Sequence, residues 1–229
     1  MTRTEQLAVV RGWEDTRATL RAWRARPLAT VAPWLAGSLA VAVLLLIATW
    51  IVAVLTMPDP MSFARTGTGD RGDFGFILYR NGLVLALHAM ACVAGFMAGS
   101  SLPIVAAGYA GWWRRVHDHA GRLAMAFVAA ATLFSLATQA YALGLTASDL
   151  SGALAISPAR LIAGLLLHAV PELCALFLPL AAWCLASRRG DWHQLLAATF
   201  VTTAIAVPVL IAAAAVEIWV SPHVLYFLK

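Results

Sequence analysis

The feature that most constrains this chain is a series of long apolar segments separated by short polar ones. An apolar run of about 20 residues is long enough to cross a bilayer as a helix, since the hydrocarbon core is about 30 Å thick. Backbone groups inside the bilayer must be satisfied internally, and runs of this length do so as helices. The sequence therefore predicts an all-α, polytopic transmembrane helix bundle of about five spans, at residues 34–57, 81–109, 122–146, 160–187 and 194–219.

Composition supports a membrane protein and excludes an ordinary soluble domain. The chain has 229 residues, of which 62% are hydrophobic and 12% charged, whereas soluble domains carry about 25% charged residues. The net charge of +5 comes mainly from arginines outside the apolar runs, six of which lie in the first 27 residues. This is expected for cytoplasmic segments and not for nucleic-acid binding. The three cysteines lie inside apolar segments, with neither zinc-site spacing nor a disulfide framework.

The first 33 residues form a separate N-terminal unit ahead of the bundle at 34–229. Large apolar residues recur there at helical intervals, on a stripe made by Val9, Trp13, Thr16, Leu20 and Trp23. Four arginines lie off that stripe: Arg11, Arg17, Arg21 and Arg24. This pattern predicts an amphipathic helix in the membrane interface. The alternative is a short soluble helix docked on cytoplasmic loops.

The polar segments between spans are predicted to be loops. They cover residues 58–80, 111–121, 147–159 and 188–193, with a short interfacial helix possible around Phe74–Tyr79. With a cytoplasmic N-terminus and five spans, eleven basic residues fall inside and five outside. The positive-inside rule therefore predicts a cytoplasmic N-terminus and an external C-terminus.

The fourth apolar segment contains an ionisable pair. His168 and Glu172 are four residues apart, so both project from one face of a helix. A carboxylate at the centre of a span costs roughly 2.5–3.5 kcal/mol on insertion scales, so such a residue marks a partner, a packing role or a ligand. Pro171 and Pro179 are expected to bend this span.

The second apolar segment carries a stripe of small and polar residues. Asn81, His88, Gly95 and Gly99 share one helical face. Gly95 and Gly99 have the spacing that lets transmembrane helices approach closely, so this face is predicted to pack in the bundle interior. Pro103 interrupts the pattern, and a proline kink is favoured there over a discontinuous helix.

Depth counting brings several polar residues to one level of the bundle. With the predicted orientation, His88, His168, Glu172 and Glu217 all lie in its outer half. We therefore expect an intramembrane polar cluster between spans two, four and five, with separate local hydrogen bonds as the alternative. Its members are His168, Glu172, Glu217, His88 and Asn81. Two histidines and two carboxylates also suit zinc, but no helical metal motif occurs. Neither a metal site nor a cofactor is predicted.

Two of these segments resemble the stage II sporulation protein M family of small integral membrane proteins. The family's His-Gly-x-x-Glu signature appears as His168 to Glu172, with alanine in place of glycine and an added Pro171. Its closing signature appears as a small-residue run followed by Glu217, Ser221 and Pro222. Asn81 through Gly95 fits the second span. The likeness covers most of the chain and implies a bacterial plasma-membrane protein that anchors a peptidoglycan-degrading complex.

Three functions follow as expectations. The first is a non-enzymatic membrane scaffold or complex subunit linked to cell-envelope remodelling, with the lipid bilayer and other envelope proteins, including a peptidoglycan hydrolase, as partners. The second is a permease-like subunit working with a separate ATPase, because the layout is similar to the membrane half of ATP-binding-cassette exporters and the chain has no phosphate-binding loop. The third, an intramembrane metal-dependent hydrolase, has no supporting catalytic motif, and no catalytic residue is predicted.

Overall fold

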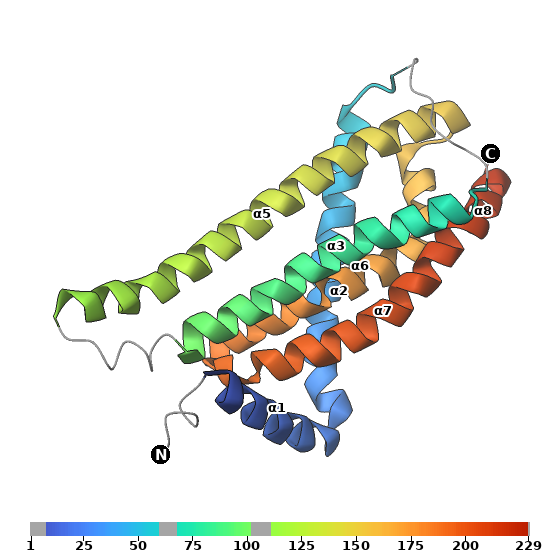
Figure 1. The fold of residues 1–229 in the computed structure, drawn as a ribbon. Coiled ribbons are helices and arrows are strands. Elements are labelled where there is room, and N and C mark those ends of the chain that lie inside the picture. The colour runs from blue at the N-terminus through green and yellow to red at the C-terminus, as the bar shows by residue number, and fades with distance from the viewer. Residues whose placement is uncertain (1–7, 60–67, 102–110, 229) are drawn as a thin grey trace.

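The computed structural model describes residues 8–59, 68–101 and 111–228, and this part of the chain is helical without strands (Figure 1). Its elements are α1 (Ala8–Arg24), α2 (Pro27–Leu55), α3 (Arg71–Phe96), the π-helix η1 (Met97–Ser101), α5 (Trp112–Leu154), α6 (Pro158–Arg189), the 3-10 helix η2 (Trp192–Gln194), α7 (Leu195–Trp219) and α8 (Ser221–Phe227). Within the described ranges, five helices are long and apolar enough to cross a membrane. The predicted polytopic bundle with a preceding N-terminal helix is confirmed.

Three helices form the centre of the bundle. In Figure 1, α3, α6 and α7 run side by side, and each packs against the other two. α2 packs along α6, and α5 joins α2 through its C-terminal half. The main apolar core lies between these helices, where Cys92, Phe177 and Leu195 are fully buried. α1 lies across one end of the bundle, against α7, η2 and α2.

Local signals explain where several helices begin and end. Asp70 and Asp73 form a reciprocal capping box that starts α3, with N···O distances of 2.9 and 3.0 Å. The Ser157 side chain caps α6, whose first residue is proline. Gly190 ends α6 with φ of +75°, a conformation that glycine adopts without strain.

Some predicted boundaries were wrong because polarity alone does not end a helix. α5 begins at Trp112 and continues to Leu154, so most of the predicted loops at 111–121 and 147–159 is helical. Few helix breakers occur between these ends, and α5 stops only where Ala155 turns left-handed. Its exposed Phe127 and Phe134 leave an apolar surface for lipid.

The second and first spans also start earlier than predicted. α3 begins at Arg71, ten residues before Asn81, so the expected interfacial helix at Phe74–Tyr79 is its first part. α2 begins at Pro27, ahead of the predicted span at 34–57, and Pro33 lies inside this helix. The predicted kink at Pro103 lies outside the described residues.

Candidate functional site

Three ionisable side chains converge near the end of the bundle opposite α1. His168 and Glu172 lie one helical turn apart on α6, and Glu217 lies in the last turn of α7. One nitrogen of His168 and one carboxylate oxygen from each glutamate all lie within 4.8 Å of one another. We call His168, Glu172 and Glu217 the carboxylate–histidine cluster. Glu172 and Glu217 are far apart in sequence, and the packing of α6 on α7 brings them together.

Two further polar residues hold the cluster in place. The Asn81 side chain on α3 donates a hydrogen bond from Nδ2 to Glu172 Oε1 at 2.9 Å. His168 Nδ1 lies 2.7 Å from Ser221 Oγ at the start of α8. Glu217 makes no hydrogen bond or ion pair with a protein group in the part of the chain that the structure describes. It therefore remains available to accept from a ligand.

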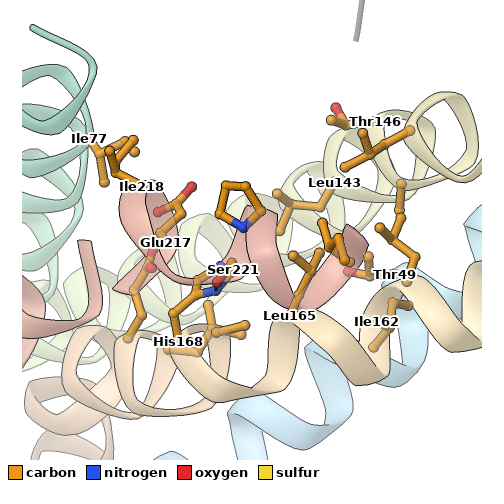
Figure 2. A pocket seen from close by; sticks show the side chains of 18 of the residues that line it. Thr49, Ile77, Leu143, Thr146, Ile162, Leu165, His168, Glu217, Ile218 and Ser221 are labelled. Carbon is orange, nitrogen blue, oxygen red and sulfur yellow. Dashed lines mark hydrogen bonds between the residues drawn. The ribbon is translucent and has the colours of Figure 1, made fainter. Parts of the chain in front are cut away.

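A cavity of about 510 Å³ adjoins the cluster, and we call it the His168 cavity (Figure 2). His168, Glu217 and Ser221 form its polar side, while Leu143 and Ile162 lie toward the other side. Most of the remaining lining is apolar and comes from α2, α3, α5, α6, α7 and α8. Such a site suits a ligand with an apolar body and one group that is positively charged or donates hydrogen bonds.

Thr49 on α2 lines the same cavity away from the cluster. This residue is 5% exposed, and its Oγ1 has no hydrogen-bond partner within the described ranges. Buried hydroxyls usually find a partner. The cavity thus has a second polar point, which the sequence analysis did not single out.

His88 does not join the cluster, although depth counting placed it at the same level. Its Nδ1 donates to the Leu176 carbonyl of α6 at 2.9 Å, and its ring packs against Phe177. One turn further along α3, the Cys92 thiol donates to the Pro179 carbonyl at 3.1 Å. Both contacts link α3 to the part of α6 that contains Pro179. His88 therefore contributes to the attachment of α3 to α6.

Gly95 and Gly99 lie where α3 and η1 approach tryptophan side chains of α6 and η2. A Cβ atom on Gly95 would lie 2.7 Å from Trp183 Nε1 of α6 and 2.8 Å from Leu195 Cδ1 of α7. On Gly99 it would overlap the base of the Trp192 side chain in η2. Both positions therefore pack against indole rings. The predicted small-residue face of the second span therefore packs against tryptophan side chains and not against small residues of another helix.

Residues of the predicted apolar stripe differ in their burial along the N-terminal helix. Gly12, Thr16 and Thr19 are buried against the bundle, whereas Trp13 on the predicted apolar stripe is 58% exposed. Trp23 packs edge-on against Trp34 of α2. Arg17 lies over the Trp13 ring, and Arg21 and Arg24 are exposed; the side chain of Arg11 lies outside the described residues.

Ser221 was noted in the sequence only as part of the closing signature, not as a partner of His168. A signal for it existed, because Glu217 and Ser221 are four residues apart and a helical register brings both to one side.

No protein-family model, curated protein or solved structure matches this chain.

Proposed function

We propose that this multi-pass membrane protein is a non-enzymatic scaffold or complex subunit, and that its His168 cavity recognises a partner. The observation that carries the proposal is the Glu217 carboxylate, which lines an otherwise largely apolar cavity without a hydrogen bond from any described residue. A carboxylate in this setting stabilises a partner that supplies the missing donor. The partner chemistry is an apolar segment bearing a basic or amide group.

The resemblance to the stage II sporulation protein M family supports the same function. His168, Glu172, Glu217 and Ser221, on which that resemblance rests, are the residues that surround the polar side of the cavity. The proposal therefore includes a bacterial plasma-membrane location, a cytoplasmic N-terminus and an envelope protein such as a peptidoglycan hydrolase as partner.

Replacement of Glu217 or Glu172 by alanine is expected to reduce recovery of the partner about tenfold or more. The reason is that a hydrogen bond to a charged group contributes about 1.5–3 kcal/mol, and 1.4 kcal/mol corresponds to tenfold in affinity. The measurement is affinity purification of the full chain in mild detergent with quantitative mass spectrometry. Glu14→Ala, at an exposed position of α1, is the matched control. Equal recovery with all three variants would rule out partner recognition by the cavity.

A permease-like subunit that works with a separate ATPase is the second candidate. The observation in its favour is the outward face of α1, at the opposite end of the bundle from the cavity. Its exposed residues are Trp13, Arg17, Arg21 and Arg24, and Arg17 lies over the Trp13 ring. An aromatic residue next to arginines is the composition of protein-binding hot spots.

This second candidate makes a separate prediction. Purification is expected to recover an ATP-hydrolysing subunit, and Trp13→Ala combined with Arg17→Ala should abolish that recovery. Tyr226→Ala, which removes an exposed aromatic side chain from α8 at the other end, should leave it unchanged. Two results would exclude the α1 face as a docking surface for an ATPase. One is that no ATPase is recovered with the wild-type chain, and the other is that the α1 double variant and the Tyr226→Ala control recover it equally.

A further inference from the structure

The carboxylate–histidine cluster has the composition of a metal site. His168 offers an imidazole nitrogen, Glu172 and Glu217 each offer a carboxylate oxygen, and these atoms lie within 4.8 Å of one another. Catalytic zinc sites commonly have three protein ligands and one open coordination position. Histidine and glutamate occur together as ligands in some of these sites. We propose that His168, Glu172 and Glu217 bind one divalent transition-metal ion, for which Zn²⁺ is the best match.

The hydrogen bonds around the cluster leave one nitrogen of His168 and one oxygen of Glu172 without a partner among the described residues. Ser221 Oγ engages His168 Nδ1, so Nε2 carries the lone pair for a metal when Nδ1–H is the donor. Asn81 engages only Oε1 of Glu172, which leaves Oε2. These contacts match the outer-shell partners that set the tautomer and orientation of metal ligands. Asn81 and Ser221 are thus positioning residues for the site.

The separation of the ligand atoms is compatible with closure around a metal. Ligands at about 2.0 Å from a tetrahedral zinc ion lie about 3.3 Å apart, so atoms separated by up to 4.8 Å must approach by about 1.5 Å at most. Glu217 can make this movement without losing a hydrogen bond to any residue that the structure describes.

Charge balance favours a divalent cation. When both carboxyl groups are ionised, they carry two negative charges together, and a neutral imidazole adds none. Arg80 is the basic residue whose field reaches Glu217, but it forms no ion pair with it in the described chain. Two uncompensated carboxylates in an apolar setting are costly. One Zn²⁺ neutralises both, and imidazole selects it over Mg²⁺ or Ca²⁺, which prefer oxygen ligands.

This inference goes beyond the proposed function, because the isolated chain needs no partner to bind a metal. The fourth coordination position can then take water or a group from a ligand in the His168 cavity. No hydrolytic step is assigned, since a bound metal can equally serve a structural or recognition role.

The test uses the full chain in lipid nanodiscs, purified through an affinity tag that contains no histidine. After treatment with EDTA, equilibrium dialysis against Zn²⁺ with elemental analysis is expected to show about one tight site per chain. His168→Ala, Glu172→Gln and Glu217→Gln should each weaken it at least tenfold, and Ser221→Ala about tenfold. His223→Ala and Glu14→Gln, at exposed positions, should leave it unchanged. The absence of a saturable site, or equal losses in the two controls, would overturn the proposal.

The wild-type chain provides a measurement that does not depend on folding of the variants. Co²⁺ should bind with a visible absorption that saturates at about one equivalent and disappears when Zn²⁺ is added. A flat titration would exclude the site. The outcome is separate from the proposed function: a chain that binds zinc but whose Glu172 and Glu217 variants retain every partner keeps the metal site and loses partner recognition.

Discussion

Gly144→Ala is expected to lower the free energy of unfolding by about 1–3 kcal/mol, although alanine normally stabilises a helix relative to glycine. Gly144 is buried where α5 crosses α2. An added Cβ would overlap the Val52 side chain at its Cβ and would lie 3.0 Å from the Thr49 carbonyl oxygen. Val52 Cβ is attached to the backbone and cannot rotate away, so the two helices must separate.

The consequence extends beyond one contact. The His168 cavity takes part of its lining from the same region of α2 and α5, including Thr49, Leu143 and Ala147. Separation of these helices should therefore alter the cavity as well as the stability.

Unfolding of the full chain by SDS in mixed micelles measures the effect. Gly82→Ala is the matched control, because it lies on a helix with nothing within 4 Å of an added Cβ. The control should be neutral or more stable by up to about 1 kcal/mol. Equal stability of the Gly144 and Gly82 variants would mean that α2 and α5 do not approach as closely as described.

Asn81→Leu is expected to cost about 1.5–3 kcal/mol of unfolding free energy, because it removes the donor to Glu172. The bond from Asn81 Nδ2 to Glu172 Oε1 spans 2.9 Å and links α3 to α6. Its loss leaves an oxygen of a largely buried carboxyl group without its only described protein donor. The unsatisfied acceptor, more than the lost contact, accounts for the cost.

A double-mutant cycle distinguishes this bond from general packing. Glu172→Leu removes the acceptor, and the double variant Asn81→Leu/Glu172→Leu removes both polar groups. The double variant should be more stable than the sum of the single effects predicts, because no polar group is left unpaired. The four proteins are compared by the same SDS unfolding experiment. Additive effects would show that the two side chains do not interact.

Much of the fold could be predicted from the sequence because it depends on local patterns. Long apolar runs identified the five spans, since a bilayer requires that length of helix. The pairing of His168 with Glu172 followed from helical periodicity alone. Helix ends were harder to predict. Polarity suggested loops at 111–121 and 147–159, but without strong helix breakers the helix α5 continues through most of both segments.

The candidate site required information that no single segment contains. His88 and Glu217 were both predicted at the level of His168, yet His88 donates to Leu176 while Glu217 joins the cluster. The depth of a residue along a helix can be counted from the sequence. The rotation of one helix about its axis relative to another helix cannot be obtained in this way.

Sequence by itself therefore determined the class, the spans and the face that each polar residue takes on its own helix. Tertiary packing decided which faces meet. Contacts such as Gly95 against Trp183 and Gly144 against Val52 set how closely and in what rotation the helices pack. The same packing turns Trp13 outward on α1 and brings Glu217 to His168. The reason is physical: periodicity is a property of one helix, whereas a site shared by several helices depends on the fit between their surfaces.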